Sequence, residues 1–95
     1  MENQSEKRRE KRQPCNDPLD FTVLVTHESD FRRIPSAGRM VDVSETGVGL
    51  VTDFPLQPGH VLEWNDSEQR GKLYIALVKW SLQKDNSCRA GLLMV

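Results

Sequence analysis

The stretch KLYIALVKW, residues 72–80, does most to decide the fold class of this chain. Aliphatic, β-branched and aromatic residues dominate it, as they do in strands that contact a hydrophobic core. Polar, turn-forming segments bound it on both sides, NDSEQRG at 65–71 and SLQKDNS at 81–87. The stretch therefore predicts a long strand that turns back into a last strand, CRAGLLMV at 88–95.

Four more strand-like segments precede this hairpin. They lie at 19–26, 39–44, 48–52 and 60–64, and LDFTVLVT at 19–26 alternates apolar and polar residues. Pro14 and Pro18 favour an extended lead-in rather than a central strand, and residues 27–38 are expected to form a polar connection. No segment has a sustained helical period. About six strands at roughly ten-residue spacing predict an all-β, antiparallel barrel or sandwich.

The composition fits one small domain that folds without disulfides. The 95 residues are 37% hydrophobic and 28% charged, and no apolar run approaches the ~18 residues of a membrane span. No apolar segment follows the basic N-terminus, so we expect no signal peptide, no membrane insertion and a cytoplasmic location. Cys15 and Cys88 are expected to be buried thiols, because they lack the CxxC spacing of a redox or metal pair.

The sequence offers no catalytic set, so we expect a binding module rather than an enzyme. His27 and His60 are predicted to be exposed polar residues, and neither lies in a sequence context that suggests activation. The chain has no zinc-protease, phosphate-loop or nucleophile-elbow motif. We therefore predict no catalytic residue, no metal ligand and no resident cofactor.

A basic cluster, KRREKR at 7–12, stands out in a chain whose formal net charge is −1. Arg8 and Arg12 have i, i+4 spacing, with Arg9 between them. Guanidinium groups pair bidentately with phosphate and with the Hoogsteen edge of guanine, so the cluster suits a compact anionic ligand. A solvated, solubilising tail is the alternative. A general nucleic-acid binder would carry a higher overall positive charge.

A second pattern, D-x-S-x-x-G, occurs within VDVSETGVGL at 41–50. Its members are Asp42, Ser44 and Gly47. An aspartate at a strand end can accept two donors from a guanine edge, and a glycine lets the backbone approach a flat ring. A simple hairpin turn closed by the serine hydroxyl is the alternative interpretation of the same residues.

Taken together, the two motifs resemble the PilZ domain, the bacterial family of cyclic di-GMP receptors. Residues 8–12 match its R-x-x-x-R motif, and residues 42–47 match [D/N]-x-S-x-x-G. VKW at 78–80, followed by a polar turn and CRAGLLMV, is similar to the hairpin that closes the family's fold. The resemblance implies a six-stranded antiparallel β-barrel at 14–95, preceded by a flexible basic arm at 1–13.

The resemblance also implies a site. Arg8 and Arg12, assisted by Arg9, would hold phosphates and guanine edges. Asp42 would accept guanine N–H groups. The full set of implied ligand-binding residues is Arg8, Arg9, Arg12, Asp42, Ser44, Gly47 and Trp80.

Four residues have roles that the sequence leaves open. Trp80 either packs in the core or at the barrel rim, or faces the ligand and stacks on a guanine. Arg32 and Arg33 are expected to be solvated loop charges, although they could reach the ligand or a partner. Arg89 could contribute to the pocket, but its strand face is not decided by the sequence.

The expected function is reception of cyclic di-GMP, bound as one molecule or as an intercalated pair. Binding would order the N-terminal arm and change contacts with a downstream protein that the sequence does not identify. One alternative is a PilZ-like adaptor that works without ligand. Another is a small barrel that binds single-stranded nucleic acid, which the few aromatic residues make the weaker interpretation.

Overall fold

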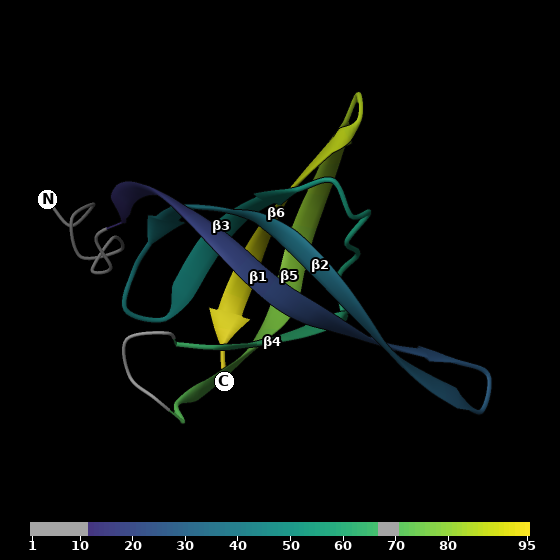
Figure 1. The fold of residues 1–95 in the computed structure, drawn as a ribbon. Coiled ribbons are helices and arrows are strands. Elements are labelled where there is room, and N and C mark those ends of the chain that lie inside the picture. Colours follow the sequence, from purple (N-terminus) through teal and green to yellow (C-terminus); the bar gives the residue numbers. More distant parts are fainter. Residues whose placement is uncertain (1–11, 67–70) are drawn as a thin grey trace, which may run out of the picture.

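The structure is a computed structural model that describes residues 12–66 and 71–95. Six strands form a closed antiparallel barrel in the order β1-β2-β3-β6-β5-β4 (Figure 1). This confirms the predicted all-β, six-stranded antiparallel barrel. The strands are β1 Gln13–His27, β2 Asp30–Val43, β3 Gly47–Thr52, β4 Val61–Asn65, β5 Leu73–Lys84 and β6 Ser87–Met94.

The inner face of every strand contributes to one core, because successive side chains of a strand point to opposite faces. Val23, Leu50 and Leu62 are completely buried, and Trp64 is 7% exposed. The other members of the core are Phe21, Val48, Leu56, Ala76, Val78, Cys88, Ala90 and Leu92.

The β1–β2 hairpin extends beyond the barrel wall, and here the sequence prediction was wrong. Residues 27–38, expected to be a polar connection, are mostly strand, with a tight turn at Glu28 and Ser29. Glu28 has a positive φ of 56°. The projecting ribbon has no buried face: Phe31, Arg32 and Arg33 are all exposed. Its sequence therefore lacks the alternation by which a half-buried strand is recognised.

Prolines occur in β1 and β2 only where the strand has a single neighbour. Pro14 and Pro18 pair with β2, while β1 contacts β4 only at residues 22–24. Pro35 lies in β2 before the pairing with β3 begins at Gly38. A residue that lacks an N–H is tolerated at such edge positions. The predicted lead-in is thus extended and non-central, as expected, but it belongs to β1.

One end of the barrel is closed by the connection between β3 and β4. Leu56 in this loop is completely buried. Its carbonyl oxygen accepts a hydrogen bond from Gln83 Nε2 at 3.2 Å. The amide of Gly59 donates to the carbonyl of Val78 at 2.9 Å. The loop is therefore part of the packed structure.

The cysteines and histidines fit the predictions in part. Cys88 is completely buried, as expected, whereas Cys15 is only half-buried and its thiol donates to the carbonyl of Met40 at 3.5 Å. His60 is half-buried rather than exposed, and its Nδ1 accepts the Gln57 amide hydrogen at 3.1 Å. The side chain of His27 lies outside the described part of the structure.

Candidate ligand-binding site

Two β-bulges turn two side chains onto the outer face of the barrel. Met40 and Val78 point inward, so strict alternation would also direct Asp42 and Trp80 inward. The register shifts between Met40 and Asp42 in β2, and again between Val78 and Trp80 in β5. Each bulge therefore places the following residue outside. β-Bulges are common where a side chain must be re-aimed next to a functional site.

The two outward-facing residues end one lateral row that crosses four strands. Asp42 is opposite Gly49, Gly49 is opposite Gly91, and Gly91 is opposite Trp80. The row runs from β2 through β3 and β6 to β5, which are consecutive in the barrel. We call these four residues the outer row. Two glycines in its middle leave space that larger residues would fill.

The space above each glycine is occupied by its neighbour in the outer row. A Cβ built at Gly91 would lie 2.9 Å from Trp80 Cδ1 and closer still to Nε1 and Cε2. A Cβ built at Gly49 would lie 2.6 Å from Asp42 Oδ1. The indole thus lies against the strand at Gly91, while 49% of Trp80 is exposed. Its outer surface is available for stacking.

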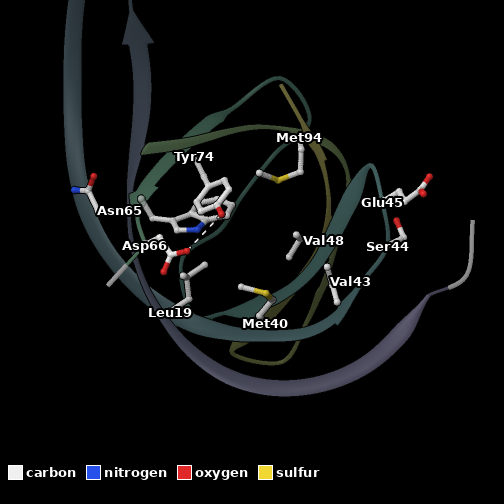
Figure 2. Close-up of a pocket in the computed structure, with 11 residues that line it drawn as sticks. Leu19, Met40, Val43, Ser44, Glu45, Val48, Asn65, Asp66, Tyr74 and Met94 are labelled. Carbon is white, nitrogen blue, oxygen red and sulfur yellow. Dashed lines mark hydrogen bonds between the residues drawn. The ribbon is translucent and has the colours of Figure 1, made fainter. Parts of the chain in front are cut away.

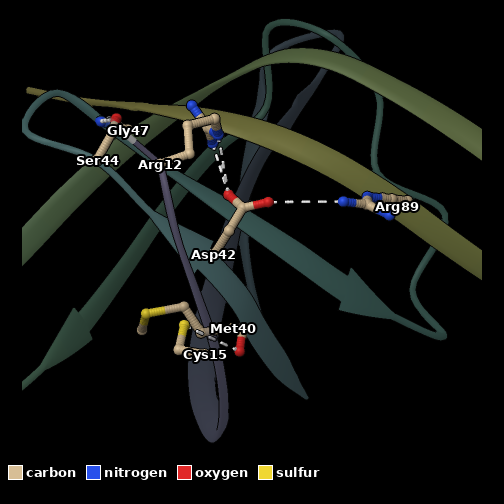
Figure 3. A network of polar contacts seen from close by, with 7 residues as sticks. All are labelled: Arg12, Cys15, Met40, Asp42, Ser44, Gly47 and Arg89. Carbon is tan, nitrogen blue, oxygen red and sulfur yellow. Dashed lines mark hydrogen bonds and ion pairs between the residues drawn. The ribbon is translucent and has the colours of Figure 1, made fainter. Parts of the chain in front are cut away.

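Asp42 lies between two guanidinium groups (Figure 3). Arg12 Nη2 donates to Oδ1 at 2.6 Å, with Nε at 3.2 Å from the same oxygen. Arg89 Nη2 lies 3.5 Å from Oδ2. Both arginines are about half exposed, whereas the Asp42 side chain is 19% exposed. Two positive charges therefore accompany one negative charge here, which favours an anionic ligand.

The turn between β2 and β3 is closed by reciprocal hydrogen bonds. The amide of Ser44 donates to the Gly47 carbonyl at 2.9 Å, and Ser44 Oγ accepts the Gly47 amide hydrogen at 3.2 Å. The simple turn interpretation of Ser44 is therefore correct as local structure, and it does not exclude a ligand role. A Cβ at Gly47 would lie 2.7 Å from the carbonyl oxygen of Leu92, so β3 and β6 approach closely here.

The structure brings together most of the predicted site residues that it describes, on one face and in the turn beside it. Arg12 contacts Asp42, which precedes the turn formed by Ser44 and Gly47 (Figure 3). Arg8 and Arg9 lie outside the described residues. Arg32 and Arg33 occupy the opposite end of β2 from Asp42, and Arg33 pairs with Glu63.

Trp80 belongs to this face rather than to the core, because its bulge turns it outward. Arg89, whose strand face the sequence left undecided, points outward and reaches Asp42.

Three residues of this face were not predicted as site residues. Gly49 and Gly91 form the middle of the outer row. Arg39 lies on the adjoining row, opposite Val51, which in turn is opposite Arg89. The glycines of GVGL and of R-x-G were visible in the sequence, but only the strand register shows that they are neighbours.

Cys15 lies close to this face without the character of a reactive thiol. Burial raises the pKa of the Cys15 thiol above its ordinary value, and the carboxylates of Asp17 and Asp42 raise it further. A raised pKa keeps the group protonated, and the thiolate is the reactive form. Within residues 12–66 and 71–95, no three His, Cys, Asp or Glu side chains are grouped as metal ligands would be.

Comparison with known families identifies the class of protein that this barrel and this face define. The PilZ domain family model matches residues 6–87. The chain therefore belongs to the PilZ domain family, which is in general a family of cyclic di-GMP receptors. Comparisons with curated proteins and with solved structures gave no significant match. The described part of the chain contains no helix long and apolar enough to cross a membrane.

Proposed function

We propose that this protein binds cyclic di-GMP on the outer face of the barrel, at the outer row and its flanking arginines. The observation that carries the proposal is the pairing of Asp42 with Arg12 and Arg89 at one end of a row that has an exposed indole at the other. A cyclic dinucleotide offers both kinds of partner at once. Its purines stack on aromatic rings, and its two phosphates pair with guanidinium groups.

The arginines and the ligand compete for Asp42. In the free protein both carboxylate oxygens face guanidinium groups. A guanine presents two adjacent N–H donors, which fit the two oxygens of one carboxylate. As the guanine binds Asp42, Arg12 and Arg89 turn from the carboxylate to the phosphates. Asp42 and both arginines therefore keep a binding partner after the exchange. The free-energy cost of desolvating these charged groups is then largely compensated.

Trp80 supplies the stacking surface for a guanine. Its indole is held by Gly91 on one side and faces solvent on the other. A ring that is already fixed loses little conformational freedom when a base stacks on it. Ser44 and the backbone at Gly47 complete the site from the adjacent turn. The ligand binds either as one molecule or as an intercalated pair, and the stoichiometry of the titration distinguishes the two.

The signal passes through the N-terminal arm, expected at 1–13 before the barrel at 14–95, although Gln13 already pairs with Val43 in β1. Arg8 and Arg9 join Arg12 on the ligand phosphates, so the arm pays its ordering entropy when the ligand binds. The ordered arm and the altered surface charge then change contacts with a downstream protein in the bacterial cytoplasm. The protein acts as a receptor and not as an enzyme, without metal or resident cofactor.

The test is calorimetric titration of the full chain with cyclic di-GMP, with GTP, GMP and cyclic di-AMP as controls. We expect saturable, selective binding of cyclic di-GMP that Arg12→Ala and Asp42→Ala each weaken at least tenfold. Arg32→Ala is the matched control, because it removes an exposed arginine from the far end of β2. Absence of heat up to high micromolar ligand contradicts the proposal and favours the ligand-independent adaptor. Equal affinity for any oligonucleotide favours the nucleic-acid alternative.

A further inference from the structure

The two ends of the barrel differ in how they are filled. Leu56 closes one end. At the other end, beside the β2–β3 turn, lies an open cavity of about 430 Å³ (Figure 2). Its apolar lining consists mainly of Leu19, Met40, Val48, Trp64, Tyr74 and Met94. We call this cavity the barrel mouth. Its volume falls within the range of about 300–1,000 Å³ typical of ligand pockets.

The lining of the barrel mouth suits an apolar side chain of variable shape. Met40 and Met94 project into it from β2 and β6 (Figure 2). Methionine side chains are flexible and polarizable, and they adapt to different apolar partners. The rings of Trp64 and Tyr74 lie 5.8 Å apart, centroid to centroid, and form one wall. Aromatic walls of this kind commonly surround the anchor residues of protein interfaces.

Both charged residues that line the barrel mouth in the described part of the chain are acidic. Glu45 and Asp66 stand on opposite sides of the opening (Figure 2). Asp66 Oδ2 accepts the Tyr74 hydroxyl at 3.4 Å. Lys72 lies near the aromatic wall, with its Nζ 5.3 Å from the Tyr74 ring centroid. An occupant with an apolar centre and basic flanks complements this rim.

We propose that the barrel mouth is the docking site for a basic amphipathic segment of a partner protein. One large apolar side chain of that segment enters between Met40 and Met94. Lysine or arginine residues on either side of it lie against Glu45 and Asp66. This is the arrangement by which an amphipathic helix docks into an apolar groove.

The barrel mouth and the outer row share the β2–β3 hairpin. Regulation of docking by cyclic di-GMP rests on the proposed function. Val43 and Ser44 line the barrel mouth, while Asp42, which precedes them in the chain, belongs to the outer row. Cyclic di-GMP that draws the arginines from Asp42 changes the environment of this hairpin. By thermodynamic linkage, if cyclic di-GMP changes the affinity of the barrel mouth for the partner segment, the segment changes the affinity for cyclic di-GMP by the same factor.

The probe is a synthetic 14-residue peptide with leucine at helical positions i, i+3, i+4 and i+7 and lysine elsewhere. Two matched peptides replace lysine by glutamate, or leucine by serine. Methyl-¹³C methionine NMR reads the result, because the chain has three methionines. Met40 and Met94 line the barrel mouth and report directly on its occupancy.

We expect the lysine–leucine peptide to shift the Met40 and Met94 methyl signals, and both matched peptides to bind at least tenfold more weakly. Glu45→Lys should weaken the lysine–leucine peptide by a similar factor. Saturating cyclic di-GMP should change the peptide dissociation constant at least threefold. Equal binding of the glutamate peptide overturns the proposal, as does an absence of shifts at Met40 and Met94. Concentration-dependent shifts without peptide, with dimers in sedimentation, would instead make a second copy the occupant.

The outcomes separate the two proposals. Cyclic di-GMP binding without peptide binding refutes the docking site and leaves the receptor function standing. Peptide binding without any cyclic di-GMP binding supports the docking site and refutes the receptor function. Binding of both with unchanged peptide affinity refutes the coupling through the β2–β3 hairpin.

Discussion

Gly91→Ala is expected to weaken ligand binding by displacing Trp80, although Gly91 itself makes no ligand contact through a side chain. The added methyl group would occupy the space that the indole ring now fills. Since 49% of Trp80 is exposed, the ring can swing into solvent. Stacking of a base on an aromatic ring contributes about 1–3 kcal/mol. Its loss corresponds to a dissociation constant about 5- to 150-fold higher.

The fold should survive this substitution. A tryptophan buries roughly 200 Å² when fully covered, and about half of Trp80 is covered here. At about 25 cal/mol per Å², complete release of the ring costs at most about 2.5 kcal/mol of unfolding free energy. Thermal denaturation checks this upper limit on the loss of unfolding free energy. Leu73→Ala is the control for the loss of apolar contact in general, because Leu73 is an exposed apolar residue on β5, the strand of Trp80.

A double-mutant cycle with Trp80→Ala makes the argument refutable. Both single variants should bind cyclic di-GMP with similarly reduced affinity in calorimetric titration. In the Trp80→Ala background, Gly91→Ala should change the affinity little, because no ring remains to be displaced. An undiminished effect of Gly91→Ala in that background, or none in the wild type, would show that the outer row does not act through Trp80.

Three further outcomes are expected. Gly47→Ala should lower the unfolding free energy by about 1–3 kcal/mol in urea titration, because its Cβ would meet the Leu92 carbonyl in the ladder; an unchanged midpoint contradicts this. Leu56→Ala should cost about 2–5 kcal/mol in the same assay, since Leu56 is completely buried; a loss under 1 kcal/mol would show that the loop does not close the barrel. Iodoacetamide should alkylate Cys15 in the native protein only at a pH above that needed for a free thiol, because its pKa is raised. Asp42→Asn should lower that pKa by removing one of the carboxylates that raise it, and an unchanged rate–pH profile would be the contrary result.

The strands could be predicted wherever one face contacts the core, since burial imposes alternation. LDFTVLVT lies inside β1, and all of KLYIALVKW except Lys72 lies inside β5. The projecting end of the β1–β2 hairpin could not be predicted, because neither of its faces is buried. Its stability comes from pairing between β1 and β2, and pairing leaves no periodic trace in the sequence.

The candidate site was predictable in part, for a related reason. Asp42, Ser44 and Gly47 were found through a motif, which is local in sequence. The direction of Trp80 was not, because Ala76, Val78 and Trp80 alternate as if all three faced the core. A bulge that shifts the register after Val78 decides the outcome. The neighbourhood of Gly49 and Gly91 likewise depends on strands that are distant in the chain.

The most direct test of the ligand site is chemical-shift mapping of the ¹⁵N-labelled protein during titration with cyclic di-GMP. The two tryptophan indole signals provide an internal comparison, because Trp80 is half exposed on the outer row and Trp64 is 7% exposed in the core. We predict that the Trp80 indole and the Gly49 and Gly91 amides shift most, while the Trp64 indole changes little. Shifts centred elsewhere, with these signals unchanged, would contradict the placement of the ligand on this face.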